Sequence, residues 1–347
     1  MVTVPQRSRV AMRRVAINTF TRFLISDSAV VDESHLVSAP AQLRKALLPK
    51  MQDVCSALLD YERNGLAFTH DTYLKAFALG SLIDGPYRYI FVDEAQDLNP
   101  VLIGIVKRSG LPAKIVGDSR QSIYAFRGAH NAMSAFQGGT FHLSQSFRFG
   151  PESAQVANWI LRQTIHPPDL PVAGLPSLDT RVEEYSGQLQ LPATVLARTN
   201  MRLIESLITC KTRFHLIGGI DTIARQLLAA HALWKGAKPG TAPWDPLVSP
   251  FQSWNDLVEA SEDDDEPELV RLVNLVETYR HDIPEIVEDI KARHVREEHR
   301  APLIVSTAHQ AKGREWSRVV MLDDFPTPSS LERSLQKRKL TPVEYDQ

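Results

Sequence analysis

The sequence has few of the features that mark specialised classes of protein. It contains two cysteines in 347 residues, Cys55 and Cys210, which excludes a disulfide framework and favours a reducing compartment. No run of about 18 apolar residues occurs, so no membrane span is expected. The basic start is not followed by an apolar core and a small-residue cleavage site, which argues against a secretory signal. We therefore expect a soluble, cytoplasmic protein.

A strong net charge is also absent. The formal charge is -2, which excludes a globally basic nucleic-acid binder but leaves room for a local basic groove. Hydrophobic residues make up 43% and charged residues 23%, the composition of a globular chain and not of a disordered one. Since domains usually hold about 100–200 residues, the length predicts two of them.

Apolar spacing separates helical from strand-rich parts. Residues 1–66 have apolar positions at steps of three or four, which predicts helices, and Pro49 is a candidate break between two of them. Residues 222–300 lack strand signals and predict a helical insertion. Short apolar runs elsewhere predict strands at 89–92, 114–116, 194–196, 214–217, 303–305 and 318–322. Strands alternating with helices in this way predict parallel α/β sheets covered on both faces.

Two carboxylates, Asp93 and Glu94, follow the first of these runs directly. Ligands of open α/β sheets bind at the carboxyl ends of strands. In nucleotide-hydrolysing proteins an Asp at this place holds Mg²⁺, usually through water, and a neighbouring Glu can orient and deprotonate the attacking water. The alternative is a strand that ends in a capped turn, with Asp93 as the cap.

Five ordered segments carry a resemblance to one family. The segment VDEAQDLNP at 92–100 resembles the Walker B motif of the UvrD/PcrA/Rep group of superfamily 1 helicases. The other segments, in that family's order, lie at 117–129, 143–148, 198–200 and 306–315. The flanking residues 69–75 and 215–220 are similar to the F-box DNA helicase branch and its bacterial relatives. The resemblance implies two RecA-like domains of the P-loop NTPase class.

The resemblance implies an ATP and Mg²⁺ site shared by several motifs. It assigns the Mg²⁺ contact, through water, to Asp93, activation of water to Glu94 and sensing of the γ-phosphate to Gln121. An amide both donates and accepts hydrogen bonds, which suits such a sensor. The alternative for Gln121 is a structural glutamine in a turn.

Further nucleotide contacts are implied in the second half of the chain. Arg148 matches a charge clamp on the γ-phosphate, and its guanidinium fork fits phosphate oxygens. Phe147 matches a residue that stacks on adenine, although packing with a surface charge is the alternative for this pair. Glu315 would accept a hydrogen bond from the ribose, and Lys312 with Gly313 would form the turn that carries it.

The resemblance also implies contact with single-stranded DNA. Tyr124 and Phe126 offer rings on which bases can stack, worth about 1–3 kcal/mol per base. Arg127 would contact the DNA backbone or stack upon a base. The alternative for Tyr124 is a place in the core. Further DNA contacts are implied, by the resemblance alone, for Arg198, Asn200, Thr307 and His309.

Two parts of such a motor are missing from the printed sequence. None of its 17 glycines is followed by lysine, so it holds no GxxxxGK[ST] loop, whose backbone N–H groups and Lys grip phosphates. Nothing after Asp324 resembles the family's final arginine motif. We therefore expect two incomplete RecA-like domains: a helical remnant at 1–70, part of the first domain at 71–140, the second at 141–221 with 301–347, and the insertion at 222–300.

The functional expectation is an ATP-dependent DNA helicase fragment that is inactive alone. The family would move 3′-to-5′ on single-stranded DNA or on DNA with a single-stranded tail. A second chain or another protein could supply the missing loop. Two alternatives stay open: a degenerate, ATP-independent module that binds DNA or a partner, and a broken gene product without a selected role. The retained Asp93 and Glu94 favour descent from an active motor.

Overall fold

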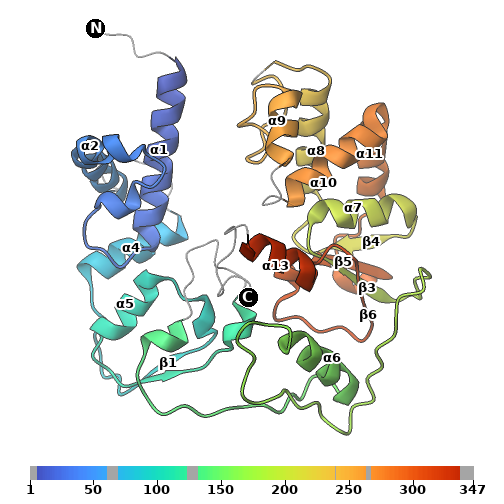
Figure 1. The fold of residues 1–347 in the computed structure, drawn as a ribbon, viewed down its shortest axis with the longest axis horizontal. Coiled ribbons are helices and arrows are strands. Elements are labelled where there is room, and N and C mark those ends of the chain that lie inside the picture. Colours follow the sequence, from blue (N-terminus) through green and yellow to red (C-terminus); the bar gives the residue numbers. More distant parts are fainter. Residues whose placement is uncertain (1–5, 61–68, 123–131, 239, 263–266, 337–347) are drawn as a thin grey trace. The chain divides into compact units, whose positions relative to one another are not determined.

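The computed structural model describes residues 6–60, 69–122, 132–238, 240–262 and 267–336. Contacts between residues divide the chain into two compact units, 1–142 and 143–346 (Figure 1). Within the described residues no helix combines the length and the apolar character that a membrane crossing needs. The predicted DNA contacts Tyr124, Phe126 and Arg127 lie outside the described residues.

The first unit begins with the predicted helices. These are α1 (Gln6–Ile25), α2 (Ala41–Leu59) and α4 (His70–Gly80), with a 3-10 turn at Glu33–His35. The predicted break at Pro49 is wrong, because α2 runs through it. A proline inside a helix removes one backbone hydrogen bond. Met51 and Cys55 follow it on the buried face, so packing against the small core of this unit holds the helix together.

A two-stranded sheet completes the first unit. The strands β1 (Ile90–Val92) and β2 (Ala113–Ile115) pair in parallel, and α5 (Pro100–Arg108) connects them. Short 3-10 helices follow each strand, at Ala95–Asp97 after β1 and at Ser119–Gln121 after β2, and another lies at Ala132–Ala135. The carboxyl ends of both strands therefore open into tight turns at one edge of the sheet.

The expectation that β1 is covered on both faces is wrong. Val92 is buried, whereas Tyr89 is 54% and Phe91 is 78% exposed. Successive side chains of a strand point to opposite faces. Val92 therefore points to the covered face, and Tyr89 and Phe91 point to a face that the described residues leave open.

The second unit contains a four-stranded parallel sheet in the order β4-β5-β3-β6. Its strands are β3 (Ala193–Ala197), β4 (Phe214–Leu216), β5 (Leu303–Thr307) and β6 (Val319–Met321). These match the four predicted runs, and the α/β class is confirmed. The helix α7 (Asn200–Thr209) follows β3, and the single turn α12 (Ala308–Ala311) follows β5.

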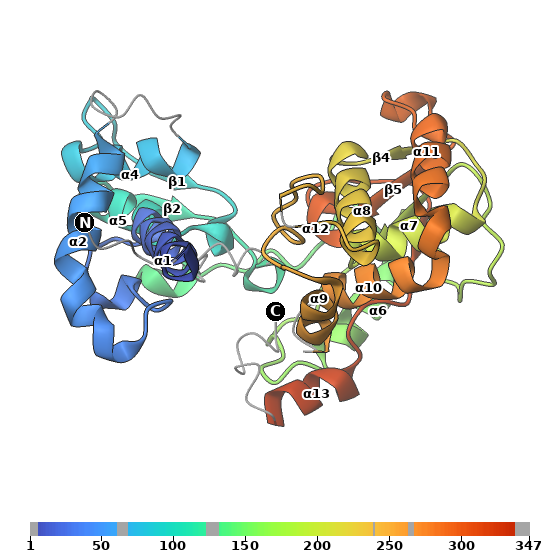
Figure 2. The same cartoon turned by 90° about the horizontal axis from the view of Figure 1, so that it is seen from above.

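Helices connect β4 to β5 in the segment for which the sequence predicted no strands. They are α8 (Asp221–Trp234), α9 (Trp254–Ser261), α10 (Pro267–Tyr279) and α11 (Ile283–Arg293), gathered beside α7 in Figure 2. Two 3-10 turns, at Arg280–Asp282 and Glu298–Arg300, flank α11. The remaining helices of this unit are α6 (Pro151–Leu161) and α13 (Pro328–Gln336).

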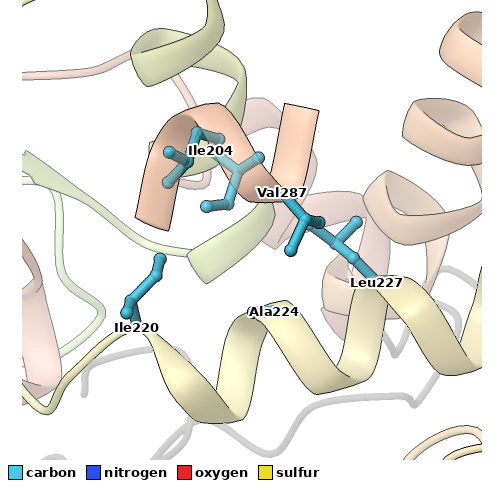
Figure 3. A pocket seen from close by; sticks show the side chains of 6 residues that line it. Ile204, Ile220, Ala224, Leu227 and Val287 are labelled. Carbon is cyan, nitrogen blue, oxygen red and sulfur yellow. The ribbon is translucent and has the colours of Figure 1, made fainter. Parts of the chain in front are cut away.

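The main apolar core lies in this second unit, where α7 packs on the sheet, α10 and α11 pack against α7, and α8 packs against α10 and α11. Figure 3 shows Ile204, Ile220, Leu227 and Val287 converging on a small space between these helices. That space has no room for a water molecule, so it is a packing defect and not a ligand site. The loops that follow β3 and β5 therefore extend from strands that are part of a well-packed core.

Candidate functional site

The turn after β1 carries the two predicted catalytic carboxylates. Asp93 and Glu94 are both exposed, and the Glu94 N–H donates to Asp93 Oδ1 at 2.9 Å. Glu94 has a left-handed backbone, with φ 50° and ψ 41°. A side chain with a Cβ costs roughly 1–2 kcal/mol in this conformation, and such outliers gather at functional sites. Two adjacent carboxylates are thus exposed at this turn, directly after the end of the strand.

A buried glutamine ties this turn to the next motif. Gln96 is 1% exposed, and its side-chain amide donates to a carboxylate oxygen of Glu94. Its Oε1 accepts from the Asp118 N–H at 2.9 Å. Gly117 makes room for this contact, because a Cβ there would lie 2.6 Å from Gln96 Oε1. The turns after β1 and β2 are therefore linked through one amide.

The predicted sensor Gln121 lies at the end of the same chain of contacts. Its Nε2 donates to Asp118 Oδ2 at 2.8 Å, and Asp118 Oδ1 accepts from the Arg120 N–H at 2.9 Å. A hydrogen-bonded path thus runs from Glu94 through Gln96 and Asp118 to Gln121. It brings the predicted catalytic residues of the first unit to one edge of its sheet.

This edge suits a magnesium ion held partly by a ligand. Among the described residues, no three His, Cys, Asp or Glu side chains gather closely enough to enclose a metal. Mg²⁺ is commonly held by one or two carboxylates, with waters and substrate phosphates completing the octahedron. Asp93, exposed beside Glu94, offers such a partial set of ligands.

In the second unit the structure brings together two residues that the resemblance assigns to the nucleotide. Arg148 Nε lies 2.8 Å from Glu315 Oε1, and the two side chains are 66% and 60% exposed. Phe147, next to Arg148, is 75% exposed. An exposed ion pair contributes at most about 1 kcal/mol to stability. The pair therefore adds little to the stability of this unit, and burial holds neither side chain in place.

The segment after β5 is shaped by a helix cap and a glycine. Thr307 is buried, and its hydroxyl accepts from the Gln310 N–H at 3.4 Å at the start of α12. Gly313 has φ 78°, the left-handed conformation that lets the chain leave α12 after Lys312. Burial, together with the nearby charge of Arg198, lowers the pKa of His309, so its imidazole is neutral near pH 7.

The predicted DNA-contact segment Arg198–Asn200 leaves the end of β3. Asp324, just beyond β6, accepts from the backbone N–H groups of Arg198 at 2.8 Å and Thr199 at 2.9 Å. It also accepts from the Thr199 hydroxyl at 2.8 Å. Thr199 in turn caps α7 by accepting from the Arg202 N–H at 3.2 Å. The segment is therefore fixed to the neighbouring strand end.

A second carboxylate holds the same segment from the helical side. Glu268, near the start of α10, accepts from the Asn200 N–H through Oε2 at 2.9 Å. Burial raises the pKa of the Glu268 carboxyl, and the neighbouring amide groups of Asn200 and Met201 oppose this shift only in part. Arg198 remains exposed and Asn200 half-buried.

Four of these residues received no role from the sequence: Gln96, Asp118, Glu268 and Asp324. Gln96 and Asp118 lie inside the motifs described above. The sequence feature that could have indicated a role for them is their position as polar residues shortly after a strand. The other two lie outside the motifs. Their importance depends on which strands and helices become neighbours, which one sequence without relatives does not show.

Comparisons with known proteins agree with the motif pattern. Residues 32–137 match the UvrD/REP helicase N-terminal domain family. The chain is 33% identical to F-box DNA helicase 1 of Gallus gallus over 284 residues, which is 77% of this chain and 27% of that protein. It is 26% identical to F-box DNA helicase protein 1 of Schizosaccharomyces pombe over 339 residues, 88% of this chain and 38% of that protein.

The chain therefore spans about a quarter to two fifths of the length of these relatives. The family match covers the turns after β1 and β2, and the longer similarities extend across most of the chain. By its motifs, its parallel sheets and these similarities, the chain belongs to the UvrD-like family of superfamily 1 helicases.

Proposed function

We propose that the chain is the part of an ATP-dependent DNA helicase that senses and positions the nucleotide and contacts single-stranded DNA. The observation that carries the proposal is the hydrogen-bonded path from Glu94 through Gln96 and Asp118 to Gln121. Such a path links the residue that would activate water to the residue that would sense the γ-phosphate. A purely structural turn has no need of a left-handed glutamate at this place.

The chain's own residues divide the work between the two units. In the first unit Asp93 would hold Mg²⁺ through water, and Glu94 would orient the attacking water and accept its proton. Gln121 would respond to the terminal phosphate. When bound, Mg²⁺–ATP supplies the phosphoanhydride bond and neutralises charge on the phosphates.

The second unit would hold the other side of the nucleotide. Arg148 would leave Glu315 to make two hydrogen bonds to phosphate oxygens, and Phe147 would stack on the base. Glu315, carried by the turn at Lys312 and Gly313, would then be available to the ribose. Arg198, Asn200, Thr307 and His309 would contact the DNA. These assignments, and 3′-to-5′ movement, come from the family resemblance.

The 347 residues hold no GxxxxGK[ST] loop, so we propose that this polypeptide alone hydrolyses no ATP above the buffer background. The test is a DNA-stimulated ATPase assay on the purified chain. A rate of about one turnover per second, the low end of ordinary enzymes, would overturn this part of the proposal. The same preparation should bind a single-stranded oligonucleotide with an affinity that falls as salt rises.

The proposed ATPase activity is tested by supplying the missing phosphate-binding loop. An in-frame GxxxxGK[ST] segment, or a partner protein that bears one, should restore DNA-stimulated hydrolysis. Asp93→Ala should abolish that restored activity, while Asp84→Ala, another exposed acidic residue of the same unit, should leave it unchanged. Equal activity of the two variants would exclude the proposed role of Asp93.

The absence of the loop favours one second candidate, an ATP-independent module that binds DNA or a partner protein. This module would bind single-stranded DNA equally well with and without ATP, and Asp93→Ala would not change its affinity. It would also stay inactive when a loop is supplied. Inactivity with a supplied loop is the outcome that separates it from the motor.

A further inference from the structure

We propose that Glu268 is a positioning residue for Asn200, through which the helical segment between β4 and β5 acts on the DNA contact. The inference rests on the proposed function, because it takes Asn200 as a residue that touches DNA. Glu268 itself would touch neither DNA nor nucleotide. Its effect would pass through the hydrogen bond from the Asn200 N–H to Glu268 Oε2, at 2.9 Å.

The first step is that the backbone donors of this segment are already used. The N–H groups of Arg198 and Thr199 donate to Asp324, and that of Asn200 donates to Glu268. A free helix N-terminus would offer such groups to a phosphate. At α7 two carboxylates occupy these donors, so the side chains of Arg198 and Asn200 must make any DNA contact. The direction of those side chains then depends on the two carboxylates.

The second step is that a glutamate at position 268 is energetically unfavourable if its only role is to fill space. Its Oε1 is buried and accepts no hydrogen bond from any group among the described residues. A buried carboxylate with one oxygen unpaired is unfavourable, and an apolar side chain of similar volume is often better tolerated. Residues that are unfavourable for packing and hydrogen bonding in this way are found mostly at functional or strained sites. What Glu268 provides here is the contact with Asn200.

The third step is that α7 and α10 are also joined by an ion pair that does not involve Asn200. Arg271 on α10 lies 3.3 Å from Glu205 on α7, and their side chains are 29% and 27% exposed. This ion pair joins the helices one turn further along and involves neither Arg198 nor Asn200. Arg271→Ala is therefore a matched control, which loosens α10 from α7 while it leaves Glu268 in place.

The experiment measures binding of a fluorescein-labelled thymidine oligonucleotide to the whole chain by anisotropy, with thermal unfolding as the folding control. Asn200→Ala should weaken binding about fivefold, the value of one hydrogen bond. Glu268→Leu, which fills the space but removes the acceptor, should cause most of that loss. Glu268→Gln keeps the acceptor and should bind within about twofold of the wild type.

The double variant Asn200→Ala with Glu268→Leu decides the matter. Because Glu268 acts through Asn200, the double variant should bind no more weakly than Asn200→Ala alone. An additive loss would overturn the proposal, and so would equal weakening by Arg271→Ala. If Glu268→Leu does not fold, Glu268→Asp serves in its place, since the shorter side chain keeps the charge but draws the carboxylate back from Asn200.

Failure of this inference can be told from failure of the proposed function. If the wild type does not bind the oligonucleotide, or Asn200→Ala binds as tightly as the wild type, the DNA contact itself is wrong. If Asn200→Ala weakens binding and Glu268→Leu does not, the DNA contact stands and the positioning role of Glu268 falls.

Discussion

Replacing Asp324 tests how firmly the tertiary structure holds the predicted DNA-contact segment. Its carboxylate accepts three hydrogen bonds, two from backbone N–H groups of Arg198 and Thr199 and one from the Thr199 hydroxyl. Thr199 is 5% exposed, so water has little access to its N–H and hydroxyl donors once the carboxylate is removed, whereas Arg198 is exposed. The loss of Asp324 should therefore destabilise the structure mainly at Thr199.

The expected magnitude follows from these three bonds. At about 1 kcal/mol each, Asp324→Ala should cost the second unit about 3 kcal/mol of unfolding free energy. For a domain of about 150–250 residues, 1 kcal/mol shifts Tm by about 2–4 °C, so we expect Tm to fall by about 6–12 °C. Asp324→Asn keeps the shape and one acceptor oxygen, and should fall between this variant and the wild type.

The adjacent residue provides a matched control. Asp323 is 82% exposed at its side chain and pairs with Arg202 at 2.9 Å. Such a surface pair is worth at most about 1 kcal/mol. Asp323→Ala therefore removes the same kind of side chain, one position away, with a shift in Tm of a few degrees at most.

Differential scanning calorimetry gives the stability, and hydrogen exchange read by mass spectrometry gives the local effect at residues 198–200. Asp324→Ala should speed exchange of the Arg198 and Thr199 amides, which donate to its carboxylate, and Asp323→Ala should not. Equal Tm values for the two variants, with equal protection of the segment, would refute the view that Asp324 fixes the end of β3.

Two further predictions concern the first unit. Burial lowers the pKa of Lys75 to about 8 from its ordinary 10.5, and its Nζ donates to the carbonyl oxygens of Ser26 and Ser28. Between about pH 8 and pH 10.5 the Lys75 side chain binds a proton in the unfolded chain but not in the folded one. The unfolding free energy of the wild type, relative to that of Lys75→Met, should therefore rise with pH over this range. Urea titrations that give the same difference between the two proteins at every pH would contradict this. Burial likewise raises the pKa of the Cys55 thiol to about 11, so iodoacetamide at about pH 8 should label the half-buried Cys210 first, as peptide mass spectrometry would show.

The sequence predicted the α/β class, the six strands and the order of the family motifs. These predictions depend on local features. A short β-branched run between polar residues predicts a strand wherever it lies, and a motif is a fixed spacing along one stretch of chain. For the same reason the sequence by itself was enough to place Asp93, Glu94 and Gln121 after the ends of strands.

The local sequence pattern predicted less well which strand residues are covered by other elements, and whether a helix continues through a proline. Tyr89 and Phe91 have the apolar character of buried strand residues but are exposed, because cover comes from other elements. Pro49 has the chemistry of a helix breaker, yet α2 passes through it because its buried face packs on the small core of the first unit. In both cases the tertiary environment outweighed an intrinsic preference.

The tertiary structure alone decided which distant residues share a site. Because β6 lies beside β3 in the sheet, Asp324 meets Thr199, 125 positions away in the chain. The packing of α10 on α7 brings Glu268 to Asn200, and the fold of the second unit brings Glu315 to Arg148. Apolar periodicity shows that a residue must be buried or paired, but the partner is set by strand order and helix packing, which depend on the whole chain.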